Sequence, residues 1–201
     1  ADRGMSPPVR VLGIAGSPRR GGNTETLLDR FLAGAAEAGA EVEKVIVSHL
    51  DLRGCIGCDT CWKADQCALE DDFTRVNRKL IESDVVALAA PLYFLHVPAQ
   101  TKALIDRGQR QWAREFVRKN SLPSTAAGRE GRRGVLLSVG GSPHPDFCGI
   151  VQTVRAFFDV YQIAYWDDLF YKDVDAKGAI EEHPTALQEA FDLGTEAVEL
   201  D

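Results

Sequence analysis

Short apolar runs alternate with helical patterns along this chain, and this alternation limits the possible folds more than any other feature. Residues 11–15, 85–90 and 135–139 are continuously apolar, which is typical of strands buried on both faces of a parallel sheet. Residues 42–47 alternate more, as expected nearer a sheet edge. Residues 163–166 carry two aromatic side chains that favour a further strand. The sequence therefore predicts five strands.

Amphipathic helices are predicted between these strands. Apolar residues share one helical face over residues 27–35 and again over residues 151–161. Prolines near the first turn introduce two more helices, over residues 99–107 and 187–198, and another is expected over residues 73–83. Strands that alternate with helices give an α/β doubly wound parallel sheet with right-handed crossovers. Five strands favour a flavodoxin-like three-layer sandwich of strand order 2-1-3-4-5 over a six-stranded dinucleotide fold.

The composition favours one domain without a nucleic-acid or membrane role. A chain of 201 residues with 45% hydrophobic residues can bury one core, and we expect a single domain over residues 5–201, beginning at Met5. The formal charge of -7, from 23 basic and 30 acidic residues, disfavours nucleic acid and anionic membranes as partners. Apolar runs stay well below the roughly 18 residues of a membrane span. We expect a cytoplasmic protein with small-molecule or protein partners.

The loop after the first strand has the composition of an anion site. Residues 16–24 read Gly-Ser-Pro-Arg-Arg-Gly-Gly-Asn-Thr and lead directly into a helix, so free N–H groups and the helix dipole meet there. Ser17 and Thr24 add hydroxyl donors and Arg19 a forked cation. Asn23 is expected to cap the helix. The spacings of triphosphate and dinucleotide loops are absent, which favours a single phosphate monoester. The alternative is an ordinary polar loop.

Two neighbouring strand ends carry groups that suit a flat ligand. The third strand ends in Pro-Leu-Tyr-Phe at residues 91–94, where Tyr93 and Phe94 offer surfaces on which a planar heteroaromatic ring can stack. The fourth strand ends in Val-Gly-Gly at residues 139–141, where the backbone can approach a ligand closely. In a doubly wound sheet the ligand binds at this carboxyl edge. Alternatively, the aromatic residues roof the core and the glycines form a tight turn.

These segments, together with Ala-Gln-Thr-Lys-Ala-Leu-Ile-Asp-Arg at residues 99–107, resemble the NADPH-dependent FMN reductase family over nearly the whole chain. The resemblance implies an FMN-binding domain in which the flavin performs the redox chemistry and no side chain acts as catalytic acid or base. It implies that the phosphate is bound by Ser17, Arg19, Asn23 and Thr24. It places the isoalloxazine ring against Pro91, Leu92, Tyr93, Phe94, Val139, Gly140 and Gly141.

Cysteines form the second notable pattern. Four of the five lie in an irregular loop, residues 50–71, with the spacing C-x2-C-x2-C-x5-C: Cys55, Cys58, Cys61 and Cys67. Such a compact set favours an iron-sulfur cluster over structural zinc, which more often uses two separated C-x2-C pairs. Zinc and free or redox-switching thiols remain alternatives. Cys148, at the start of a helix, is expected to be a buried spare thiol.

The cysteine pattern and the first loop together resemble the iron-sulfur flavoprotein branch of that family. This resemblance implies a 4Fe-4S cluster that exchanges electrons with FMN, in a homodimer or homotetramer. Electrons would come from NAD(P)H or a ferredoxin-like protein and could pass to a small-molecule acceptor. The chief alternative is a cluster-free NAD(P)H-dependent FMN or quinone reductase. A second alternative is a non-catalytic redox-sensing or zinc-stabilised binding protein on a flavodoxin-like scaffold.

Overall fold

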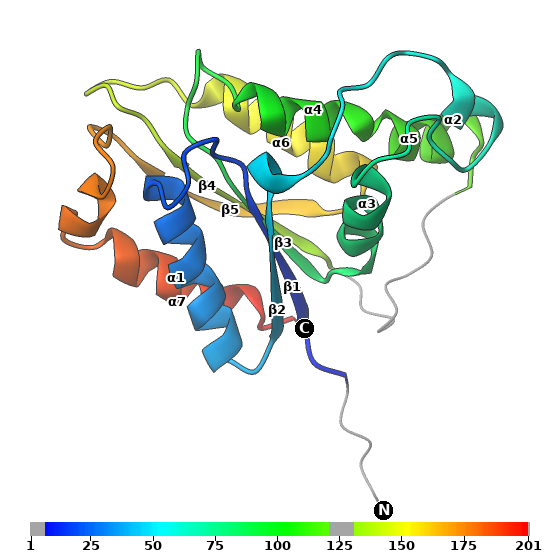
Figure 1. Ribbon diagram of the computed structural model, residues 1–201. Coiled ribbons are helices and arrows are strands. Elements are labelled where there is room, and N and C mark those ends of the chain that lie inside the picture. The colour runs from blue at the N-terminus through cyan, green and yellow to red at the C-terminus, as the bar shows by residue number, and fades with distance from the viewer. Residues whose placement is uncertain (1–6, 121–130, 201) are drawn as a thin grey trace, which may run out of the picture.

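The computed structural model describes residues 7–120 and 131–200. Its centre is a five-stranded sheet in which all strands are parallel and the order is β2-β1-β3-β4-β5 (Figure 1). This confirms the predicted fold class and strand order. The strands are β1 (Arg10–Ala15), β2 (Glu41–Ile46), β3 (Val85–Ala89), β4 (Arg133–Val139) and β5 (Ala164–Tyr171).

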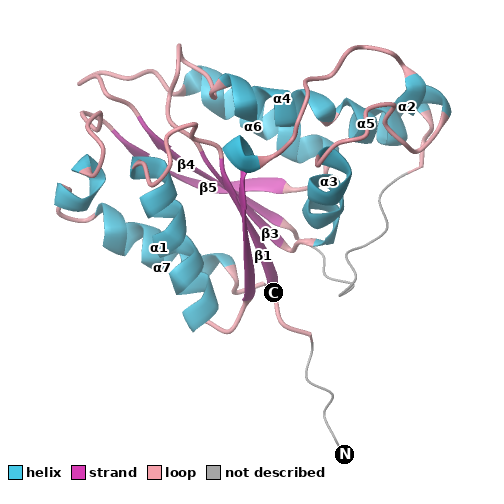
Figure 2. Cartoon of the chain, viewed as in Figure 1, coloured by secondary structure: helices cyan, strands magenta, loops and turns pink. Residues whose placement is uncertain are grey.

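Helices cover both faces of the sheet and complete three layers (Figure 2). One face carries α1 (Asn23–Glu37) and α7 (Ala186–Ala197). The opposite face carries α3 (Phe73–Glu82), α4 (Ala99–Arg107) and α6 (Cys148–Val160). Short helical segments complete the described chain: η1 (Val47–His49), α2 (Thr60–Lys63), α5 (Gln109–Trp112), the π-helix η2 (Ala113–Val117) and η3 (Ala179–Glu182). No helix within residues 7–120 and 131–200 is long and apolar enough to cross a membrane.

The core has two halves because side chains alternate along each strand. In β1, Val11 and Ala15 pack with α1 and α7, whereas Leu12 and Ile14 pack with α3, α4 and α6. All four are at most 2% exposed. Burial on both faces explains why the sequences of β1 and β3 are continuously apolar. The carboxyl ends of these strands are thereby fixed at one edge of the sheet.

The structure extends the predictions in two places. β5 continues to Tyr171, five residues beyond the predicted end, with a register irregularity at Trp166, which has no partner between Tyr165 and Asp167. Two adjacent aspartates in this half-buried edge strand hide its continuation, because they interrupt any apolar pattern. The second addition is the pair α5 and η2, which follows α4 after Gly108.

Candidate functional site

The predicted anion loop joins β1 to α1 and leaves the first turn of the helix open. The N-cap residue of α1 is Gly22, which has no side chain to bond the N–H groups of that turn. The prediction that Asn23 caps the helix is therefore wrong. Asn23 is the first helical residue, and its amide instead donates to the Ala176 carbonyl at 2.9 Å and accepts from the Gly178 N–H at 2.9 Å. Asn23 thus ties the segment after β5 to the anion loop.

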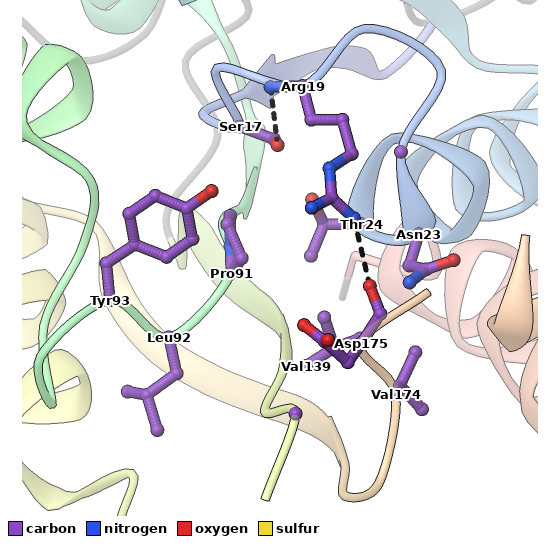
Figure 3. A pocket seen from close by; sticks show the side chains of 12 residues that line it. Ser17, Arg19, Asn23, Thr24, Pro91, Leu92, Tyr93, Val139, Val174 and Asp175 are labelled. Atoms are coloured by element: carbon purple, nitrogen blue, oxygen red, sulfur yellow. Dashed lines mark hydrogen bonds between the residues drawn. The ribbon is translucent and has the colours of Figure 1, made fainter. Parts of the chain in front are cut away.

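A pocket lies at the carboxyl edge of the sheet, where the ends of four strands meet (Figure 3). The anion loop forms one side, and the ends of β3 and β4 form the other. Tyr93 and Arg19 approach the pocket from opposite sides. The lining residues are Ser17, Arg19, Gly22, Asn23, Thr24, Pro91, Leu92, Tyr93, Val139, Gly141, Val174 and Asp175. The structure therefore brings together all the predicted cofactor-binding residues except Phe94 and Gly140.

Phe94 lies at the tip of a tight turn outside the pocket. Tyr93 and His96 exchange backbone hydrogen bonds of 2.8 and 2.9 Å, so the chain reverses between them. Phe94 and Leu95 both take positive φ, +48° and +69°, which is uncommon for residues with side chains. The Phe94 side chain is fully exposed, at 100%. It does not line the pocket, whereas Tyr93 does.

Close packing against Pro145 requires a glycine at position 140. A Cβ on this residue would stand 2.6 Å from the Pro145 Cβ, so only glycine allows the two segments to pack. Its N–H donates to the Tyr171 carbonyl at 2.9 Å, and its carbonyl accepts from the Val174 N–H at 3.1 Å. Gly140 therefore joins the end of β4 to the end of β5. Gly141, one residue further, lines the pocket.

The segment after β5 contributes a wall that the sequence did not predict. Val174 and Asp175 line the pocket, and the Arg19 guanidinium donates to the Asp175 carbonyl at 2.9 Å (Figure 3). The Lys177 ammonium lies beside Gly21, 3.5 Å from where a Cβ would stand there. A signal for this wall exists in principle, because the carboxyl ends of all parallel strands share one edge. It was missed because β5 was predicted to end before residue 171.

One carboxylate that does not line the pocket holds the anion loop in place. Glu25 accepts a hydrogen bond of 2.8 Å from the Gly21 N–H and pairs with Lys44 at 3.1 Å. Burial acts to raise the pKa of Glu25, but the Gly21 and Lys44 contacts outweigh it and lower that pKa. The ionised Glu25 fixes the loop, while the Arg19 side chain and the open turn of α1 supply donors on the pocket side. The pocket thus combines an anion cradle with an apolar and aromatic wall.

The four clustered cysteines line a second cavity, about 210 Å³ in volume. The chain turns sharply between them, because Gly57 and Asp59 take φ of +64° and +54°. The cavity is lined by Cys55, Ile56, Gly57, Cys58, Asp59, Cys61, Trp62, Cys67, Ala68, Leu69, Arg107, Gln109 and Arg110. Cys148 lies apart at the start of α6 and is exposed, so the expectation of a buried thiol is wrong.

The thiols share this cavity without converging on one point. In the described part of the chain, no group of three or more His, Cys, Asp or Glu side chains is placed to hold a metal ion. Burial, together with the neighbouring cysteines, raises the pKa of Cys61. The hydrogen bond with the Thr60 hydroxyl, at 3.4 Å, lowers the pKa of Cys58. The cavity therefore holds thiols of unequal acidity in a common wall.

The fold and the pocket define an α/β protein of the flavodoxin-like class. The family described as NADPH-dependent FMN reductase matches residues 9–142. The iron-sulfur flavoprotein of Methanosarcina thermophila is 31% identical over 153 residues, which span 76% of this chain and 74% of that protein. An iron-sulfur flavoprotein of Archaeoglobus fulgidus is 43% identical over 99 residues, 49% of this chain and 45% of that protein.

The chain belongs to the NADPH-dependent FMN reductase family, in its iron-sulfur flavoprotein branch. A solved structure with the same fold is the NAD(P)H:quinone oxidoreductase from Methanothermobacter marburgensis, with a TM-score of 0.65. That match covers 94% of this chain and 97% of the other, at 18% identity. At this identity it supports the fold alone.

Proposed function

We propose that this protein is an FMN-dependent electron-transfer oxidoreductase that binds FMN in the pocket at the carboxyl edge of the sheet. The observation that carries the proposal is the pairing, in one pocket, of an anion cradle and an aromatic wall. A phosphate monoester joined to a planar ring needs both surfaces. Membership of a family described as FMN reductases supports the same ligand.

Different residues of the pocket would bind different parts of FMN. Ser17, Thr24 and Arg19 would bind the phosphate together with the open N–H groups of α1. The ring would lie between Tyr93 and the 139–141 segment, and Asn23 would act indirectly by holding the segment after β5. Bound FMN supplies one- and two-electron redox chemistry, while the protein supplies position and electrostatics. The proposal requires no side-chain acid or base.

The proposal extends to the cysteine cavity, as the site of a 4Fe-4S cluster that exchanges electrons with FMN. Three observations support it: the compact spacing of the cysteines, their common cavity, and the relatives named iron-sulfur flavoproteins. The electron donor would be NAD(P)H or a ferredoxin-like protein, and the acceptor a small molecule or such a protein. The working form would be a homodimer or homotetramer, without nucleic-acid or membrane partners.

A second candidate function is a cluster-free NAD(P)H-dependent reductase of FMN or a quinone. The four cysteines line a cavity separate from the flavin pocket, so that pocket is complete without them, which favours this candidate. The flavin pocket would serve both functions equally well. Only the chemistry of the cysteines separates the two, so the test must examine metal, sulfide and flavin together.

The test is anaerobic purification followed by an absorbance spectrum and analysis of iron, zinc and acid-labile sulfide. The variants are Cys58→Ser, inside the cavity, and Cys148→Ser, an exposed cysteine outside it. We expect flavin bands and about four irons per chain, with the iron lost only in Cys58→Ser. Flavin without iron or sulfide would favour the cluster-free reductase. Protein that cannot bind flavin would contradict the proposal and favour a non-catalytic role.

A further inference from the structure

Arg107, the last residue of α4, is the most deeply buried cation next to the cysteine cavity among the described residues. It is 2% exposed, lines the cavity, and lies 4.6 Å over the Phe73 ring. Its guanidinium forms a two-pronged pair with Asp71, with bonds of 2.5 and 3.1 Å. The side chains of the pair are 1% and 0% exposed. Such a pair persists only when its geometry is well satisfied.

The same guanidinium binds both arms of the cysteine loop (residues 50–71). It donates to the Arg53 carbonyl at 2.8 Å, before the first cysteine, and to the Leu69 carbonyl at 3.4 Å, after the last. Asp71 adds a further link, because its carboxylate accepts the Arg53 N–H at 3.2 Å. Arg107 therefore fixes the distance between the two arms that carry the thiols.

Two guanidinium N–H groups at this wall lack partners. The Nε atoms of Arg107 and Arg110 are buried and make no hydrogen bond within residues 7–120 and 131–200. A buried donor without an acceptor destabilises the fold, and folded proteins rarely leave one unpaired. Both residues line the cavity of the four thiols. Sulfur carrying negative charge in this cavity would supply the missing acceptor.

The charge at Arg107 suits this role. A guanidinium is charged at any ordinary pH, and that of Arg107 lines the same cavity as the Cys67 thiol. The planar guanidinium binds Asp71 and two carbonyls through its terminal nitrogens and still has its Nε–H to donate. A lysine ammonium cannot make all of these contacts.

We propose that Arg107 is a positioning residue of the cysteine cavity, which sets the spacing of the thiolates and donates its Nε–H to the sulfur of the metal centre they hold. The identity of that centre as 4Fe-4S rests on the proposed function. The positioning role applies to any metal bound by the four thiolates. Hydrogen bonds to cluster sulfur favour the more negative, reduced form, so Arg107 raises the reduction potential.

The first test uses Co²⁺ alone as the probe, added anaerobically to protein free of iron and followed by the thiolate-to-cobalt absorption bands. Arg107→Lys keeps the charge and removes the fork. Arg10→Lys is the matched control, because Arg10 forms an exposed pair with Glu82 at 3.3 Å, away from the cysteine loop, and does not line the cavity. We expect Co²⁺ to bind about 10- to 100-fold more weakly to Arg107→Lys and unchanged to the control. Unchanged affinity in Arg107→Lys would overturn the proposal.

The second test measures the reduction potentials of the loaded protein by anaerobic titration. The cluster potential should fall in Arg107→Lys, while the FMN potential of that variant and both potentials of Arg10→Lys stay at the wild-type values. FMN binding reports folding of each variant. If Arg107→Lys does not bind FMN, the double variant Arg107→Gln/Asp71→Asn, a neutral pair, replaces it. An unshifted cluster potential in a folded variant would overturn the proposed hydrogen bond.

The two tests separate this proposal from the proposed function. Wild-type protein that binds Co²⁺ through the four thiols but never carries iron and sulfide would contradict the cluster, and the cobalt test would still decide the role of Arg107. Wild-type protein that binds no Co²⁺ would contradict both.

Discussion

The anion loop and the cysteine loop hold their ligand groups in different ways. The anion loop is short, begins at β1, and is fixed by backbone contacts such as the 2.7 Å bond from the Gly16 N–H to the Ala89 carbonyl. The cysteine loop is long and carries exposed apolar side chains, Ile56 at 64% and Trp62 at 46%. It is held mainly by charged side chains. The first site takes its shape from the sheet, and the second from a few ion pairs.

Two ion-pair groups hold the cysteine loop. The buried Arg107–Asp71 pair joins its two arms to α4. In the middle of the loop, Asp65 pairs with three arginines of the segment that follows α4, at distances of 3.5, 3.4 and 2.8 Å: Arg110, Arg114 and Arg118. Removing a charge should therefore destabilise the cysteine loop far more than the anion loop.

The largest effect is expected for Asp71→Ala. This change leaves the Arg107 guanidinium buried without its partner, which should lower the free energy of unfolding by about 3–5 kcal/mol. Urea denaturation measures the change. The control is Asp106→Ala, which removes an exposed pair with Lys102 on the same helix and should cost at most about 1 kcal/mol. Equal losses in the two variants would mean that the buried pair does not hold the loop.

The next effect is expected in the anion loop with Arg19→Ala. Loss of a charge-assisted bond to phosphate, about 1.5–3 kcal/mol, should weaken FMN binding about 10- to 100-fold. Stability should change little, because the bond of Arg19 to the Asp175 carbonyl is exposed. Quenching of flavin fluorescence measures the affinity. Arg20→Ala, a neighbour that does not line the pocket, is the control. An FMN affinity unaffected by Arg19→Ala would remove Arg19 from the phosphate site.

A smaller effect, on the pH dependence of the free energy of unfolding, is expected for Asp65→Asn. Burial acts to raise the pKa of Asp65, but the three arginines outweigh it and lower that pKa. A carboxylate whose pKa is lower in the folded protein than in the unfolded chain stabilises the fold at pH values above its unfolded pKa of about 3.9. This stabilisation is lost as the pH falls through the folded pKa. Unfolding free energy measured from about pH 6 to pH 3 should fall less in Asp65→Asn than in wild type. Identical pH profiles would show that the ion pairs of Asp65 do not contribute to the stability of the fold.

The smallest effect is expected for Phe94→Ser. The side chain stands at the tip of the turn, 100% exposed, so the change should alter FMN affinity by less than about 0.5 kcal/mol. Tyr93→Ser, which removes a side chain that lines the pocket, is the comparison. If Phe94→Ser weakens FMN binding as much as Tyr93→Ser does, the turn must fold over the ring when flavin binds.

The sequence predicted the fold better than it predicted the details of either site. Three of the five strands followed from buried apolar runs, because burial on both faces leaves little choice of side chain. The two edge strands followed from an alternating pattern and from aromatic residues, and the order followed from the number of strands. The extension of β5 was missed because a half-buried edge strand tolerates Asp167 and Asp168. Val174 and Asp175 were missed with it, since they lie just beyond that strand.

Side-chain and backbone detail was harder to predict. Nothing in the sequence indicates that Phe94 and Leu95 adopt left-handed backbone conformations, which such residues seldom take. The compact spacing did predict that four cysteines share one region. It did not indicate Arg107, whose partners are distant in sequence. Asp71 accepts the Phe73 N–H at 3.0 Å at the start of α3 and also binds Arg107.

The most direct test of the central claim compares FMN with riboflavin, its analogue without phosphate, on protein freed of flavin. Fluorescence quenching should show one FMN per chain. Because two or more charge-assisted hydrogen bonds to phosphate contribute about 1.5–3 kcal/mol each, riboflavin should bind about 100-fold more weakly or worse. Equal affinities for the two flavins, or no quenching by FMN, would contradict the assignment of residues 16–24 as a phosphate site.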